Sequence, residues 1–218
     1  MQWYERDVSE LAAYLAAHPV ADPAVLYGSS SIRLWTTMAA DLKNERAVNA
    51  GFGGSTLEAC AFFFQQIIPP LKPASLLVYA GDNDLGDGRS PEDVLQSFRL
   101  LAAQVDRHCG PIPFGFIAIK PSPAREDILH SIQRANTLIR FEIERRAHGF
   151  YVPVLDAMLR DGRPRPELFL DDGLHLGPKG YELWTKLLEP FRNELFDAGS
   201  DARSERPPSD SAPPESST

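Results

Sequence analysis

The sequence predicts a doubly wound α/β sandwich built around a parallel sheet of about five strands. Short apolar runs alternate with longer amphipathic stretches along the chain up to about Leu195. The apolar runs are continuous instead of alternating, which is typical of parallel strands whose two faces are both covered by helices. Strands and helices that alternate in this way pack as a central parallel sheet with helices on its faces.

Five apolar runs are the predicted strands, and apolar residues at helical spacing mark predicted helices. The strands are Ala24–Tyr27, Ala47–Ala50, Ser75–Ala80, Phe114–Ile119 and Phe150–Leu155. The helices present Tyr4, Val8, Leu11 and Leu15; Val94, Phe98, Leu101 and Val105; Ile128, Ile132, Leu138, Ile139 and Ile143; and Trp184, Leu187, Leu188, Phe191 and Leu195. Before the second of these, Ser90 predicts an N-cap and Pro91 suits the first helical position.

Length and composition indicate one domain over residues 1–197, followed by a tail over residues 198–218. The chain has 218 residues, of which 43% are hydrophobic, and this is enough for an ample core. From Ala198 to Thr218 no apolar residue is larger than alanine, while serine, proline and charged residues dominate. Such a segment cannot bury enough surface to offset its ordering entropy, so the tail is predicted to be disordered.

The charge balance and the apolar pattern exclude several partners. A net charge of −8 argues against a nucleic-acid surface, because phosphate binding needs clustered Lys and Arg. No apolar run has the length of a membrane span, and the first residues lack the basic and apolar regions of a signal peptide. We therefore expect a cytoplasmic protein in which Cys60 and Cys109 are reduced core residues.

Polar clusters follow the predicted strands. Gly28–Ser31, Gly51–Gly54, Gly81–Asp84 and Lys120–Arg125 come after the first four strands, and Asp172–His175 lies between the fifth strand and the last helix. In open parallel sheets, ligands bind outside the carboxyl ends of the strands. All five clusters should therefore meet at one edge of the sheet, where one pocket can gather them.

A serine, a histidine and an aspartate in these clusters are candidates for nucleophilic catalysis. His175 is the candidate base, because imidazole can remove the proton of a serine hydroxyl near neutral pH. Asp172 lies three residues earlier and can bond one ring nitrogen, which leaves the other to face the serine. The spacing does not choose among Ser29, Ser30 and Ser31, and a serine at this place is also a common helix cap.

The glycine-rich turn and the asparagine are candidates for an oxyanion hole. The backbone N–H groups of Gly54 and Ser30 and the side-chain amide of Asn83 can donate to a developing oxyanion. Taken alone, the glycines are also consistent with a tight turn, and Asn83 with a turn former. A phosphate-binding loop is disfavoured, because no third glycine and no Gly-Lys-Ser/Thr follows, and no metal-binding spacing occurs.

Further polar residues near the same edge are candidates for substrate binding. These are Arg33, Asp84 and Arg125, with Trp35 and Lys120 beside them. Arg125 follows the rigid Pro121-Ser122-Pro123 segment and can bind an anionic or sugar-linked substrate. The alternative for Arg125 is a helix-capping or ion-pair role.

The polar blocks resemble those of the SGNH hydrolases, also called GDSL esterases and lipases, from about Val25 to Trp184. The phrases that carry the resemblance are YGSSSIRLW, NAGFGGST, YAGDND, IKPSPAR and FLDDGLHLGPKGY. The resemblance places the nucleophile on Ser30, because Gly28-Ser29-Ser30 overlays Gly-Asp-Ser, with Ser29 in place of the aspartate. It places the oxyanion donors on Ser30, Gly54 and Asn83, and the other triad members on Asp172 and His175.

The resemblance also implies a fold and an activity. It implies a flavodoxin-like, three-layer αβα sandwich and hydrolysis of esters or thioesters, with no metal or organic cofactor. We expect a serine esterase that acts on a small carboxylic ester with a short or acetyl group, sugar-borne esters included, through an acyl-enzyme. The alternatives are a thioesterase or lysophospholipase of the same family, or a catalytically inert binding module on this fold. The oligomeric state is left open.

Overall fold

A five-stranded parallel sheet forms the centre of the molecule. The structure is a computed structural model that describes residues 1–197, so the predicted tail lies outside the described residues. The strands are β1 (Ala24–Gly28), β2 (Ala47–Gly51), β3 (Ser75–Tyr79), β4 (Phe114–Ile117) and β5 (Gly149–Val152). They are ordered β2-β1-β3-β4-β5, and every neighbouring pair is parallel. This is the flavodoxin-like order, and the predicted fold class is confirmed.

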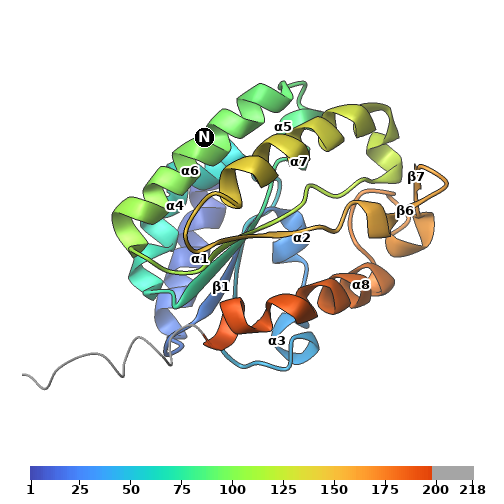
Figure 1. Ribbon diagram of the computed structural model, residues 1–218. Coiled ribbons are helices and arrows are strands. Elements are labelled where there is room, and N and C mark those ends of the chain that lie inside the picture. Colours follow the sequence, from blue (N-terminus) through green and yellow to red (C-terminus); the bar gives the residue numbers. More distant parts are fainter. Residues whose placement is uncertain (198–218) are drawn as a thin grey trace, which may run out of the picture.

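Helices cover both faces of the sheet (Figure 1). One layer consists of α1 (Glu5–Ala17), α4 (Leu57–Ile67), α6 (Pro91–Cys109) and α7 (Leu129–Ile143), each in contact with the next. The other face carries α3 (Met38–Asp41) and α8 (Pro178–Leu188). Two short helices, α2 (Ser30–Arg33) and α5 (Asp82–Gly86), begin just after β1 and β3.

The remaining elements are short. One is a small antiparallel pair, β6 (Leu159–Arg160) and β7 (Arg163–Pro164). The others are single turns, mostly 3-10 in type: η1 (Gln2–Tyr4), η2 (Pro69–Leu71), η3 (Pro123–Ile128), η4 (Asp156–Met158), η5 (Pro166–Leu168), η6 (Glu189–Phe191) and η7 (Asn193–Asp197). Within residues 1–197, no helix has the length and apolar character that crossing a bilayer requires.

Two helices differ from the sequence-based expectation. The last one was expected to continue to Leu195, but α8 ends at Leu188. Pro190 follows, and a proline lacks the N–H and the space that an α-helix needs, so the chain continues as η6 and η7. Helix α4 was not predicted, because its nearly continuous apolar run hides the helical period. Its start is marked by Thr56, which accepts a hydrogen bond from the Ala59 N–H.

Aromatic rings connect α8 to the sheet and to the segment that follows α2. Trp35 stacks on Tyr181 with ring centroids 5.2 Å apart, and Trp184 lies 4.9 Å from Tyr79 at the end of β3. Trp35 and Trp184 are almost completely buried, in the same hydrophobic core as the strands. Burial of such large side chains is a major stabilising contribution, and here it holds the loop before α8 next to the end of β1.

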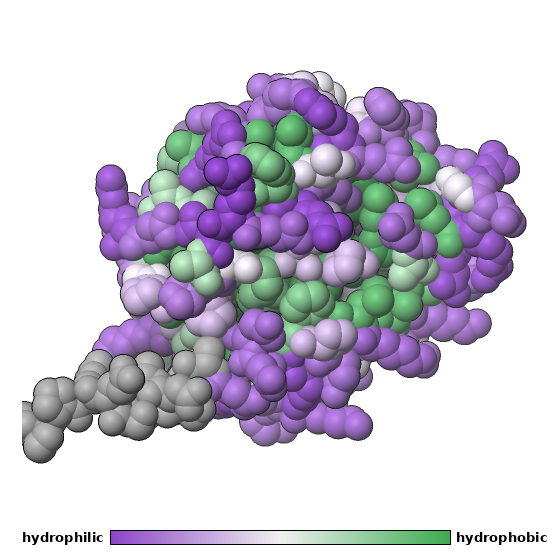
Figure 2. Space-filling view, viewed as in Figure 1, coloured by the Kyte–Doolittle hydropathy of each residue, from purple (hydrophilic) through white to green (hydrophobic). Residues whose placement is uncertain are grey.

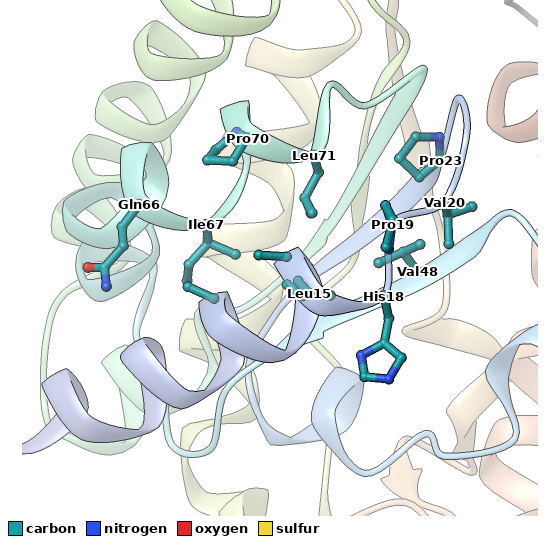
Figure 3. Close-up of a pocket in the computed structure, with 12 residues that line it drawn as sticks. Leu15, His18, Pro19, Val20, Pro23, Val48, Gln66, Ile67, Pro70 and Leu71 are labelled. Carbon is teal, nitrogen blue, oxygen red and sulfur yellow. The ribbon is translucent and has the colours of Figure 1, made fainter.

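An apolar cavity of about 260 Å³ lies near the edge of the sheet where the strands begin (Figure 3). Its lining includes Leu15, Pro23 just before β1, Val48 near the start of β2, Ile67 and Leu71. The cavity is therefore at the amino ends of the strands, away from the polar clusters. Its lining is mostly apolar, with His18 and Gln66 as the residues that carry polar side chains.

Candidate active site

The polar clusters meet at the carboxyl edge of the sheet, and Gly28 makes the turn out of β1 possible. Gly28 has a φ of +141°, and a Cβ at this position would lie 1.8 Å from the carbonyl oxygen of Tyr79. The next N–H, that of Ser29, donates to the same carbonyl at 2.9 Å. The Phe52 N–H donates to the Gly28 carbonyl, also at 2.9 Å. A residue with a side chain would displace these strand ends, so glycine is required here.

The three consecutive serines differ in their access to solvent. Ser29 and Ser31 are each 1% exposed, whereas Ser30 is partly exposed. Ser30 is also the first residue of α2, so its backbone N–H has no acceptor within the helix. Of the three hydroxyls, that of Ser30 is therefore the one that a ligand can reach.

Asp172 holds the ring of His175. The carboxylate Oδ2 lies 2.6 Å from Nδ1 of the ring, and Oδ1 accepts the backbone N–H groups of Leu174 and His175 at 2.8 and 2.9 Å. These hydrogen bonds, that of the His175 ring first, lower the pKa of Asp172 to about 2. An ionised carboxylate only accepts, so Nδ1 carries the hydrogen, and Nε2 of the neutral ring is left as the acceptor.

The Asp172–His175 loop is fixed to its surroundings by backbone hydrogen bonds. The Leu170 N–H donates to the His175 carbonyl at 2.8 Å, and the Ala124 N–H of η3 donates to the Gly173 carbonyl at 3.0 Å. A side-chain hydrogen bond joins α8, which follows this loop, to the serine turn: the Tyr181 hydroxyl donates to the Ser31 carbonyl at 3.2 Å. No hydrogen bond joins Ser30 to His175 in the described part of the chain. Catalytic hydrogen bonds often tighten only when a substrate binds.

Two of the three proposed oxyanion donors, Gly54 before α4 and Asn83 in α5, are brought together at Ser55. Gly54 is exposed, has a φ of +67°, and has open space where a Cβ would lie. Its carbonyl accepts the Tyr4 hydroxyl at 2.8 Å, and within residues 1–197 its N–H donates to no other group. The side-chain nitrogen of Asn83 donates to the Ser55 carbonyl, next to Gly54, at 3.1 Å. One amide hydrogen of Asn83 remains for a ligand.

Arg125 fixes the orientation of the Asn83 amide. The guanidinium donates to Oδ1 of Asn83 at 3.0 Å, which turns the nitrogen of the amide toward Ser55. It also lies 3.1 Å from Oδ2 of Asp82, and its side chain is only 18% exposed. Arg125 therefore forms an ion pair in this structure, and its substrate-binding role stays a prediction.

Asp82 lies between two cations. Lys120 Nζ is 2.9 Å from Oδ2 of Asp82, and both side chains are buried. Burial by itself raises the pKa of Asp82, but Lys120 and Arg125 together outweigh it, and the pKa is lowered. The sequence analysis did not assign this cluster, although a lysine directly after a strand that is buried on both faces was a signal for it.

Asp84 occupies a place that differs from its expected role, whereas the expected role of Arg33 stays a prediction. Asp84 is fully buried, and its carboxylate accepts the Leu57 N–H at 2.9 Å at the start of α4. A carboxylate without solvent access cannot contact a bound substrate, so the expectation for Asp84 is wrong. Arg33 is exposed and reaches Asp7 of α1 at 3.5 Å.

The cysteines and the acidic residues form no further centre in the described structure. Cys60 is buried, Cys109 is half-buried, and both are free thiols. Among residues 1–197, no group of three or more His, Cys, Asp and Glu side chains is arranged to hold a metal ion.

The sheet order, together with a polar carboxyl edge, is typical of flavodoxin-like α/β proteins that bind ligands at this edge. Residues 20–183 match the GDSL-like Lipase/Acylhydrolase family, and the chain belongs to this family of SGNH hydrolases. The resemblance noted in the sequence is thus confirmed. No curated protein sequence matches the chain.

Several solved structures share the fold. A GDSL-like lipase from Bacteroides thetaiotaomicron superimposes with a TM-score of 0.71 at 19% identity, covering 84% of this chain and 96% of that chain. An acetyl esterase mutant with an acetate ion has a TM-score of 0.63 at 16% identity, with coverage of 81% and 99%. A carbohydrate esterase family 3 structure from Talaromyces cellulolyticus has a TM-score of 0.61 at 16% identity, with coverage of 79% and 97%.

The buried ion cluster predicts a large loss of stability in Asp82→Asn. The substitution leaves the Lys120 ammonium buried without a carboxylate, so the free energy of unfolding should fall by about 3 kcal/mol or more. Urea denaturation followed by circular dichroism measures the loss. Glu92→Gln is the control, because it removes only an exposed ion pair with Arg134 and should cost less than about 1 kcal/mol. Equal losses of unfolding free energy in the two variants would contradict a stabilising role for the buried ion cluster.

Burial of Asp84 predicts that Asp84→Asn and the original protein differ in stability in a way that depends on pH. Burial raises the pKa of its carboxyl to about 6, so the folded state favours the protonated form. Its ionisation therefore costs stability as the pH rises from about 4 through 6, whereas below pH 4 both states are protonated. Asp84→Asn keeps the acceptor for Leu57 and removes the charge. It should be more stable than the original protein at pH 8, by roughly 2 kcal/mol, and about equal at pH 4 in urea titrations. Lower stability at pH 8 would contradict this account.

Proposed function

We propose that this protein is a serine esterase that hydrolyses short-chain carboxylic esters such as acetates. The observation that carries the proposal is the 2.6 Å contact between Asp172 and the His175 ring, at the sheet edge where Ser30 is the accessible hydroxyl. Membership of an acylhydrolase family supports the same reaction class. The acetyl esterase and carbohydrate esterase with this fold are consistent with a small acyl group.

In the proposed reaction, Ser30 forms an acyl-enzyme. Nε2 of His175 accepts the proton of the Ser30 hydroxyl as Oγ attacks the ester carbonyl carbon. The ionised Asp172 stabilises the resulting imidazolium and keeps the ring in one orientation. The tetrahedral intermediate then collapses, the imidazolium protonates the leaving alkoxide, and the alcohol departs. Water repeats the sequence on the acyl-enzyme and releases the carboxylic acid.

The oxyanion of the tetrahedral intermediate needs hydrogen-bond donors that are already in position. The backbone N–H groups of Ser30 and Gly54 and the amide of Asn83 are proposed to supply them. Arg125 is proposed as a positioning residue that acts through Asn83, because it holds the amide oxygen away from the oxyanion. Donors fixed before the reaction cost no reorganisation when the charge develops.

The nucleophile is tested by replacing the three serines one at a time. Ser30→Ala should lower the turnover of p-nitrophenyl acetate by roughly a thousandfold or more, because no other accessible hydroxyl is present at this turn. Ser29→Ala and Ser31→Ala, whose side chains are buried, should retain most of the activity. A fluorophosphonate should label the original protein and leave Ser30→Ala unlabelled. Absence of labelling in the folded original protein would favour an inert binding module.

The oxyanion donors are tested by kinetics of single and double variants. Asn83→Ala should lower kcat by roughly a hundredfold with little change in KM, because its amide binds the oxyanion in the transition state. Arg125→Met should also lower kcat. In the double variant, the loss should be close to that of Asn83→Ala alone, because Arg125 acts through the amide. Losses that multiply would show that Arg125 acts independently of Asn83.

A further inference from the structure

A groove of about 680 Å³ lies beside the proposed catalytic residues, between α8 and the segment that follows α2. Leu34, Leu170, Leu176 and Tyr181 are prominent in its lining. The volume is within the range of small-molecule sites in proteins.

The two walls of the groove are joined to the proposed catalytic residues by backbone hydrogen bonds. On one wall, the Leu34 N–H donates to the carbonyl of Ser30 at 2.8 Å. On the other, the Leu170 N–H donates to the carbonyl of His175 at 2.8 Å, and Leu176 is the next residue in the chain. Each wall is therefore attached to one of the two residues that exchange the proton.

Most of the polar side chains around the groove, Thr36 excepted, are bonded to other side chains or to the backbone. Asp41 accepts hydrogen bonds from the Trp35 indole at 2.7 Å and from the Thr37 hydroxyl at 2.6 Å. Lys186 is paired with Glu182 at 2.7 Å, and the Thr185 hydroxyl donates to the backbone of α8. These groups have partners already, so a ligand gains less from hydrogen bonding to them.

Two apolar side chains of the lining, in contrast, are open to solvent, whereas Leu176 and Tyr181 are buried. Leu34 is 42% exposed and Leu170 is 48% exposed, and they belong to a small set of large hydrophobic side chains exposed among residues 1–197. Figure 2 shows hydrophobic residues gathered on the face of the molecule that carries α8, surrounded by hydrophilic ones. An exposed apolar surface in a groove beside reacting groups favours a ligand with hydrocarbon to bury.

The position of His175 decides which part of an ester would occupy the groove. In the proposed reaction, the imidazolium protonates the leaving oxygen, so the alcohol portion must extend from the neighbourhood of Nε2. Leu170 bonds to the backbone of His175 and Leu176 follows His175 in the chain, whereas two of the three oxyanion donors, Gly54 and Asn83, belong to segments that do not line the groove. The alcohol portion is therefore the part of the ester nearest to the groove.

We propose that the groove binds an aliphatic alcohol chain, so that the preferred substrates are short-chain esters of apolar alcohols. This inference rests on the proposed esterase function and adds the class of leaving group. It disfavours the sugar-borne esters considered from the sequence, because a sugar would place its hydroxyl groups against Leu34 and Leu170.

The test compares two series of esters on the purified protein. In the first, the acyl group is acetyl and the alcohol is ethyl, butyl or hexyl. In the second, the alcohol is ethyl and the acyl group is lengthened from acetyl to hexanoyl. Values of kcat/KM should rise by roughly two- to fourfold per added methylene in the alcohol series, and remain nearly flat in the acyl series.

Two groove variants and a matched control test whether the dependence of kcat/KM on alcohol length comes from the groove. Leu34→Gln and Leu170→Gln keep the approximate side-chain size but remove the apolar surface, so the ratio of kcat/KM for hexyl acetate to that for ethyl acetate should fall at least threefold in each. Leu100→Gln is the control, since Leu100 is 52% exposed on α6, outside the groove, and this ratio should not change.

The outcomes separate this inference from the proposed function. Turnover with a flat alcohol series, a dependence on acyl length instead, or a preference for acetylated sugars would overturn the groove assignment and leave the esterase function in place. An unchanged ratio in both groove variants would also overturn it. If no ester is hydrolysed and Ser30 is not labelled by a fluorophosphonate, the esterase function fails and this inference fails with it.

Discussion

The buried carboxylate of Asp82 holds together the carboxyl edge of the sheet. It follows β3 and is paired with Lys120 and Arg125, which follow β4. An ionised group without solvent is tolerated only when charged partners surround it, so these two connections must pack in one arrangement. Arg125 belongs to η3. The Ala124 N–H of η3 donates a hydrogen bond to the Gly173 carbonyl, in the loop that contains Asp172 and His175. The position of His175 thus depends, through η3, on the charge of Asp82, although Asp82 does not contact His175.

A second connection, made by hydrocarbon, reaches the same loop from the other side. The stacked rings of Trp35 and Tyr181 join the segment after α2 to the first turns of α8, and Trp184 packs on the end of β3. The serine turn is therefore held by the close approach of Gly28 to Tyr79, and the histidine loop by the aromatic contacts of α8. Ionic and apolar contacts together restrict the geometry of residues that are far apart in the chain.

Local pattern was enough to predict the class of the fold. Continuous apolar runs became the five strands, of which β1, β3 and β4 are buried along their whole length, because a parallel strand covered on both faces is apolar throughout. Ser90 caps the start of α6 as predicted, because a cap depends on residues within one turn, and Asp93 completes a capping box there. The end of α8 at Leu188 was also encoded locally, in Pro190. Helix α4 was missed because burial among α1, α6 and the sheet removes the polar face on which the helical period depends.

The sequence by itself determined the order of the polar blocks and the edge of the sheet at which they gather, since four of the blocks directly follow a strand and the fifth lies between the last strand and the last helix. The hydrogen bond between Asp172 and His175 was predictable too, because the two residues are three positions apart. Tertiary structure alone decided that Ser30 is the exposed serine, that Asp84 is buried under α4, and that Arg125 orients Asn83. It also brought Leu34 and Leu170 into one groove. The physical reason is that burial and pairing depend on neighbours from distant parts of the chain, which no local pattern specifies.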